Sequence, residues 1–189
     1  MRARHPKMSL DIVVGGLRAG ATDILDEAGK RFRLEHWARV EQASGLPFDR
    51  EGLLARKNFV YNTEPVCRAV VAARVLAPKA DLLRVFRAFQ HAFYADARDT
   101  TDGAVLAAVG AEASSAIGHL VMRDEFLAVW RQQSTIEATE IEFARARSMG
   151  VTNFPTLFLE QNGRFHRVSS GYAPVAQLEQ DLNVLLAAA

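Results

Sequence analysis

The sequence predicts an α/β protein in which a sheet is interrupted by a long helical insertion. Three observations lead to this prediction. A run of strand-forming residues, Leu10–Val14, lies early in the chain, and two more strand-like runs flank Asn162-Gly163 near its end. Between these runs the apolar side chains recur at helical spacing. Strands at both ends with helices between them are typical of a sheet that carries an insertion.

Size and composition restrict the class of protein. The 189 residues suffice for one domain, or for a small domain with an insertion, and 49% of them are hydrophobic. The net charge is +1, and no cluster of Lys or Arg has the density of a nucleic-acid face. No apolar run reaches the ~18 residues that cross a bilayer. We therefore expect neither nucleic acid nor a membrane as partner, and a cytoplasmic location, with which the single cysteine agrees.

The first third of the chain predicts one strand and two helices. Leu10–Val14 contains β-branched residues and is bounded by Gly15 and Gly16, which indicates a short buried strand. Looser apolar spacing then predicts helices over residues 24–43 and 48–56.

The clearest helix start follows at Thr63. Its hydroxyl can cap a helix, and Pro65 suits the first helical turn. This helix should run from Glu64 to Leu76, because Pro78 then ends it. Periodic apolar residues predict further helices over residues 79–95, 104–109, 113–121, 124–130 and 135–149.

The end of the chain predicts a hairpin followed by a helix. Gly150 should end the preceding helix, and Pro155 opens an apolar strand. Asn162-Gly163 is a strong signal for a two-residue hairpin turn. The two strands and the final helix are predicted over residues 156–160, 165–168 and 175–187.

These motifs carry a family resemblance. The segment Gly150-Val151-x-x-x-Pro155-Thr156, followed by a strand, Asn-Gly, a second strand and a helix, resembles the DsbA-like branch of the thioredoxin superfamily. Three shorter segments resemble its cytoplasmic-type members: Gly15-Gly16-Leu17, Glu64-Pro65-x-Cys67-Arg68-Ala69 and Ala92-Phe93-Tyr94.

The resemblance implies a fold and a domain division. It implies a thioredoxin-like sheet, made of the N-terminal strand and the C-terminal hairpin, with a large all-helical insertion. Residues 1–44 and 148–189 would form an incomplete thioredoxin-like domain, and residues 45–147 the helical insertion domain.

The resemblance also implies a binding site. It implies a cis peptide bond between Phe154 and Pro155, although a trans proline at the start of an edge strand is the common arrangement. An extended substrate can pair with the backbone before such a proline. Asn153, Phe154 and Pro155 are therefore the predicted substrate-binding residues. The implied partners are protein or peptide thiols and disulfides, with no cofactor and no metal.

The Cys-x-x-Cys pair of this family is absent from the sequence, whose only cysteine is Cys67. Because Leu10–Val14 matches the family's second strand, we expect the first strand and the cysteine pair either to lie upstream of Met1 or to be lost. The chain as printed should then be inactive. Without its first strand the sheet would have unpaired backbone N–H and C=O groups, each of which costs about 1–3 kcal/mol when buried. We expect another copy of the chain, a partner segment, or direct pairing of the Leu10 and Thr156 strands to satisfy these groups.

The remaining candidates carry less chemistry. Cys67 lies near a helix start, which can activate a thiol, but one cysteine cannot cycle between dithiol and disulfide, so we expect it to pack as a small apolar residue. Glu137, Glu140 and Glu142 are expected to form a solvated helix face. The five histidines have no ligand spacing for a metal.

Two other functions remain open. One is a glutathione-dependent isomerase or transferase of the hydroxychromene-carboxylate isomerase type, with glutathione beside Phe154 and Pro155. The other is a redox-dead thioredoxin-like binding module that forms a homo-oligomer through its open sheet edge.

Overall fold

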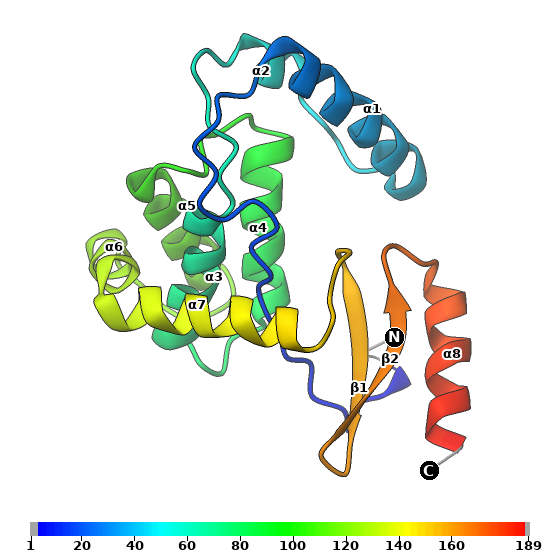
Figure 1. Ribbon diagram of the computed structural model, residues 1–189. Coiled ribbons are helices and arrows are strands. Elements are labelled where there is room, and N and C mark those ends of the chain that lie inside the picture. Colours follow the sequence, from blue (N-terminus) through cyan, green and yellow to red (C-terminus); the bar gives the residue numbers. More distant parts are fainter. Residues whose placement is uncertain (1–3, 188–189) are drawn as a thin grey trace. The chain divides into compact units, whose positions relative to one another are not determined.

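The computed structural model describes residues 4–187, which form two compact units (Figure 1). The hairpin unit comprises the described parts of Met1–Gly15 and Glu142–Ala189. The helical unit comprises Gly16–Ile141. The predicted division into residues 1–44 with 148–189 and residues 45–147 stays a prediction, and its outermost residues lie outside the described chain.

Aspartate side chains cap several helices of the helical unit. The side chains of Asp26, Asp49 and Asp102 accept hydrogen bonds from first-turn amides of three of these helices. Another spans the residues predicted for it, with Pro65 in its first turn. The Thr63 hydroxyl does not cap it as predicted, because it accepts a hydrogen bond from the N–H of Arg18 (3.0 Å). The helices are α1 (Glu27–Ser44), α2 (Arg50–Ala55), α3 (Glu64–Leu76), α4 (Leu82–Tyr94), α5 (Gly103–Ser115), α6 (Arg123–Arg131) and the first part of α7 (Gln133–Ser148).

Helix α5 differs from its prediction. It is one continuous helix that ends at Ser115, where the sequence predicted separate helices over residues 104–109 and 113–121. Gly118 follows with a φ of 86°, a left-handed conformation that a helix cannot continue through. The end of the second predicted helix is therefore a turn and a loop.

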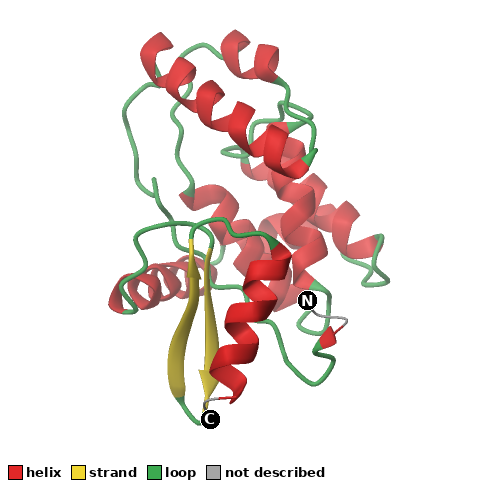
Figure 2. Cartoon of the chain, turned by 90° about the vertical axis from the view of Figure 1, so that its right-hand side faces the viewer, coloured by secondary structure: helices red, strands yellow, loops and turns green. Residues whose placement is uncertain are grey.

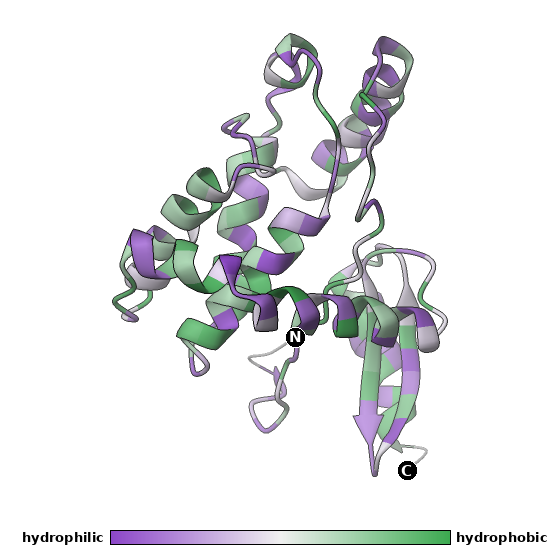
Figure 3. Ribbon diagram, turned by 60° about the vertical axis from the view of Figure 1, so that its left-hand side comes forward, coloured by the Kyte–Doolittle hydropathy of each residue, from purple (hydrophilic) through white to green (hydrophobic). Residues whose placement is uncertain are grey.

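The best-buried part of the helical unit lies where α3, α5 and α6 meet. Leu106 and Phe126 have 0% of their surface exposed. A Cβ atom at Gly110 would lie 2.3 Å from the Phe126 ring, so only glycine allows this close approach of α5 and α6. The mixture of green and purple residues along the helices in Figure 3 is typical of helices that bury one face.

A second cluster in this unit is aromatic. It joins α1, α2 and α4, and ring centroids such as those of Trp37 and Tyr94 lie 5.1 Å apart. Its aromatic members are Trp37, Phe48, Phe59, Tyr61, Phe93 and Tyr94.

The hairpin unit contains β1 (Thr156–Gln161), β2 (Arg164–Ser170), the end of α7 and α8 (Val175–Ala187). The strands are antiparallel, and the turn residues Asn162 and Gly163 both have positive φ, which is typical of a type I′ turn. Helix α8 covers one face of the hairpin (Figure 2). Leu159, Val168 and Leu182 form the buried core of this face.

The two strands differ in regularity. Leu157 lies opposite Ser169, whereas Phe158 lies opposite Arg167. Val168 is therefore an extra residue, a β-bulge in β2. The bulge leaves β1 regular along its whole length.

The strand predicted over Leu10–Val14 is not formed. In the described chain these residues form a loop without strand pairing, and they do not pair with β1. Val14 is nevertheless buried, and its main-chain N–H donates to the Glu142 side chain in place of a neighbouring strand. The apolar pattern thus predicted the burial of Val14 but not its hydrogen-bonding partner.

Candidate functional site

The segment between α7 and β1 holds the predicted substrate-binding residues, and its start is fixed by a helix C-cap. Gly150 has a φ of 68°, and its N–H donates to the carbonyl of Arg147 (2.9 Å). The N–H of Val151 donates to the carbonyl of Ala146 (3.1 Å). These two bonds form a Schellman motif, which ends α7 and directs the chain toward β1.

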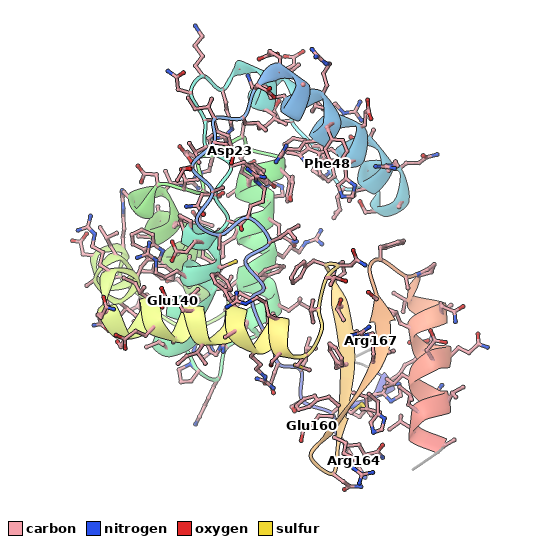
Figure 4. All side chains as sticks on the ribbon, in the orientation of Figure 1. Asp23, Phe48, Glu140, Glu160, Arg164 and Arg167 are labelled. Carbon is pink, nitrogen blue, oxygen red and sulfur yellow. The ribbon has the colours of Figure 1, made fainter. Side chains whose placement is uncertain are left out.

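Arg167 on β2 reinforces this helix end (Figure 4). Its Nη2 donates to the carbonyl oxygens of Met149 (3.3 Å) and Gly150 (3.2 Å). Its guanidinium also lies 5.6 Å from the ring centroid of Phe158. A cation at the C-terminal end of a helix is electrostatically favourable. Arg167 therefore ties the start of the segment to the hairpin.

The peptide bond between Phe154 and Pro155 is cis. The hydroxyl of Thr156 donates to the carbonyl of Asn153 (2.5 Å), and the N–H of Gly171 donates to the carbonyl of Pro155 (2.8 Å). Asn153, Phe154 and Pro155 are all exposed, the Phe154 side chain to 42%. The three residues thus form one continuous surface segment at the start of β1.

Phe154 differs from its neighbours in the hydrogen bonding of its main-chain groups. Within residues 4–187, neither its N–H nor its carbonyl has a hydrogen-bond partner, while the carbonyls on both sides are engaged. Both groups are available to an extended chain, which pairs through the same donor and acceptor.

The ring of Phe154 lies against the loop that contains Gly15. A Cβ atom at Gly15 would lie 1.9 Å from Phe154 Cε1, so this contact requires glycine. The preceding residue, Val14, donates its N–H to Oε2 of Glu142 on α7 (2.8 Å). Glu142 therefore holds the loop that supports the ring.

The sequence pattern did not identify two of these supporting residues. Glu142 was expected on a solvated face with Glu137 and Glu140; those two are exposed, but Glu142 is only 8% exposed. Nothing in its sequence neighbourhood signals a tertiary partner. For Gly15 the Gly-Gly pair was a usable signal, although it was interpreted as the end of a strand and as part of the family resemblance, and not as a contact of Phe154.

Cys67 lies in α3, in the helical unit. It is half-buried, and its N–H donates to the carbonyl of Thr63 (3.2 Å) as the first regular bond of that helix. The expectation that Cys67 packs as a small apolar residue and has no catalytic role stays a prediction.

A half-buried carboxyl group lies one turn before this cysteine. Burial raises the pKa of Glu64, and the nearby charge of Glu140 raises it as well. The ion pair with Arg68, 2.9 Å between Nε and Oε1, acts in the opposite direction. Arg68 also stacks on Trp130, 3.7 Å from the ring centroid. We interpret this group as structural, because the charges of Glu64 and Arg68 pair with each other.

The described chain lacks the features of a metal site and of a membrane span. No group of three or more His, Cys, Asp or Glu side chains in it could hold a metal ion. None of its helices combines the length and apolarity needed to cross a membrane.

Comparison with known proteins gives a consistent result at the level of structure. No family model matches the sequence, and no curated protein is similar to it. A candidate protein disulfide isomerase from Nitrosomonas europaea is 27% identical and superposes with a TM-score of 0.83, over 99% of this chain and 86% of the other.

Two further solved structures are of the cytosolic disulfide reductase DsbM from Pseudomonas aeruginosa. The first is 23% identical with a TM-score of 0.67, over 95% of this chain and 84% of DsbM. The second, solved with GSH, is 22% identical with a TM-score of 0.64, over 94% and 83%. These neighbours confirm the α/β fold class with its helical insertion. The chain has the fold of the DsbA-like thioredoxin-fold proteins, as its motifs implied.

Proposed function

We propose that this chain is a protein of the DsbA-like disulfide oxidoreductase type that binds an extended, thiol- or disulfide-bearing segment along Asn153-Phe154-Pro155. The observation that carries the proposal is the main chain of Phe154, whose N–H and carbonyl have no partner in the described chain. An extended peptide supplies both partners at once. The three structural neighbours, whose names refer to disulfide isomerisation or reduction, support this choice.

Binding can be tested by titration calorimetry with a short extended peptide that carries one cysteine. Phe154→Ala should weaken peptide binding about tenfold. The exposed Phe154 ring lies beside the main-chain groups that would pair with the peptide, and aromatic side chains are typical anchors of an interface. Phe165→Ala is the matched control, since Phe165 lies in the same unit and is similarly exposed, at 47%. An N-methylated version of the peptide, which lacks the pairing N–H, should also bind weakly. Equal losses in the two variants would contradict the proposal.

We propose further that this polypeptide alone does not turn over disulfides. Exchange between a dithiol and a disulfide requires two thiols, and Cys67 is the only cysteine in the sequence. Reduction of insulin with dithiothreitol as electron donor should proceed at the rate without protein. A catalysed rate that Cys67→Ser abolishes would overturn this statement.

A cytoplasmic location goes with this proposal. It is supported by the single cysteine and by the cytosolic location of the neighbour from Pseudomonas aeruginosa.

The glutathione-bound neighbour favours a second candidate, a glutathione-dependent isomerase or transferase. Glutathione would then pair with Phe154 beside Pro155. Titration with reduced glutathione separates the two candidates, because binding of glutathione without binding of the cysteine peptide favours the second. A non-enzymatic binding module that self-associates through the edge of β1 is the third candidate.

A further inference from the structure

Tyr172 is an exposed aromatic side chain that contributes little to the fold. It is 67% exposed, more than Phe154 at 42%. In the part of the chain that the structure describes, its hydroxyl has no hydrogen-bond partner and its ring contacts no other aromatic ring. It also lies outside the apolar cluster that α8 covers. Tyrosines with an exposed ring and an unbonded hydroxyl are typical of binding surfaces, so Tyr172 is available to a ligand.

The turn between β2 and α8 places Tyr172 beside Pro155. The N–H of Gly171 donates to the carbonyl of Pro155 (2.8 Å), so the residue before Tyr172 lies directly against the binding segment. Gly171 has a φ of 90°, a left-handed conformation that glycine adopts readily, and the chain leaves β2 here. This turn and the start of β1 lie at the same end of the hairpin (Figure 1). Tyr172 therefore leaves the sheet at the level of the candidate site.

We propose that Tyr172 determines specificity at this site, and that it selects an extended chain with an aromatic residue next to its cysteine. This inference rests on the proposed function, because it names the side chain that the same site accepts. A chain paired with Phe154 lies on one side of Pro155 and the Gly171 turn on the other, each at the spacing of neighbouring strands, about 4.8 Å. Side chains that rise above Pro155 from both sides meet with ring centroids about 4.5–7 Å apart.

The surroundings of Tyr172 favour an apolar ligand side chain over a charged one. The two segments that meet here, residues 148–159 and 168–178, contain no Asp, Glu, Lys, Arg or His. A carboxylate or ammonium group of the ligand would find no opposite charge on either segment, and burying it against them would be costly. Val175, the first residue of α8, adds a further exposed apolar side chain, at 58%. An aromatic residue gains contact with the Tyr172 ring at no such cost.

The test is titration calorimetry of the full chain with extended peptides that differ in one residue. Each peptide carries one cysteine, with phenylalanine or serine directly before it in one pair of peptides and directly after it in a second pair. In one of these pairs the wild type should bind the phenylalanine peptide about two- to tenfold more tightly. Tyr172→Ala should remove this preference. Tyr172→Phe should keep it, because the ring and not the hydroxyl makes the contact.

Two further variants separate this inference from the proposed function. Phe154→Ala should weaken binding of both peptides of a pair, since it removes an anchor of the binding segment itself. Phe165→Ala, at the other end of the hairpin and 47% exposed in the wild type, should change neither affinity nor preference. Circular dichroism of each variant verifies that it is folded.

The outcomes are distinct. A wild type that binds the phenylalanine and serine peptides equally, or a preference that persists in Tyr172→Ala, would overturn the role of Tyr172 and leave the proposed function standing. A wild type that binds none of the peptides would overturn both.

Discussion

The helical unit and the hairpin unit differ in how their main-chain N–H and carbonyl groups are hydrogen-bonded. In the helical unit the backbone groups bond within helices, aspartate side chains cap three helix starts, and Leu106 and Phe126 are fully buried. In the hairpin unit the described chain leaves the main-chain N–H and carbonyl of Phe154 without hydrogen-bond partners. This difference is the basis of the proposal that the hairpin unit binds an extended chain.

This contrast supports the proposed binding segment more than any single side chain does. The only cysteine lies in the helical unit, where its N–H is already bonded. The residues that the family resemblance marks for binding lie in the hairpin unit. The predictions that follow alter one unit at a time.

The largest effect is expected in the helical core. Phe126→Ala should lower the free energy of unfolding by about 3–5 kcal/mol, because it leaves a cavity where α5 and α6 meet at Gly110. Urea denaturation measures this change. Phe32→Ala, at an exposed position of α1, should stay within about 0.5 kcal/mol. Similar values for the two variants would contradict the assignment of the core.

The contact between Gly15 and Phe154 gives the next effect. Gly15→Ala should destabilise by about 1–3 kcal/mol and weaken peptide binding, because the new methyl group displaces the Phe154 ring. The same substitution in a Phe154→Ala background should be almost neutral. A double-mutant cycle by denaturation shows whether the coupling exists. Additive effects would show that the ring does not rest on this glycine.

Arg167 should have a smaller effect on the hairpin unit. Arg167→Met removes both bonds to the end of α7 and should cost about 0.5–1.5 kcal/mol. The matched control is Arg164→Met, which removes an exposed arginine from the same strand. An equal loss of stability in both variants would show that the effect comes from removing a positive charge and not from losing the bonds to the end of α7.

The smallest effect is a pH dependence in the helical unit. A raised pKa of Glu64 means that folding favours its protonated form, so this stability is present at low pH and is lost as pH rises through the folded pKa. The wild type should therefore lose stability relative to Glu64→Gln as pH rises above 4.5, the ordinary pKa of a glutamate. Arg68→Met should steepen the dependence, because the Arg68 charge lowers this pKa. If the difference in stability between the wild type and Glu64→Gln is constant with pH, or has the opposite sign, burial does not raise the pKa of Glu64.

Local chemistry made much of the fold predictable. Helices α3 and α8 span the predicted residues, since Pro65 in the first turn favours the start of α3 and apolar spacing determines α8. The predicted cap by the Thr63 hydroxyl was wrong, because that hydroxyl accepts from the N–H of Arg18 instead. The hairpin turn followed from Asn162-Gly163, whose residues tolerate positive φ.

The parts that depend on partners were not predictable in this way. Leu10–Val14 has the composition of a strand, but a strand also needs a neighbour to pair with, and the described chain supplies none. Glu142 is buried through its bond to Val14, a contact between residues far apart in sequence. The predicted site Asn153-Phe154-Pro155 came from a motif, whereas its support by Gly15 and Glu142 required the structure.

The most direct measurement is hydrogen exchange at the amide of Phe154. In the free protein this N–H should exchange near the rate of an unprotected amide, and it should slow on addition of the extended cysteine peptide. The amide of Val70, inside α3, should stay protected throughout and serve as internal reference. A Phe154 amide that is already protected, or that is unchanged by a bound peptide, would contradict the account.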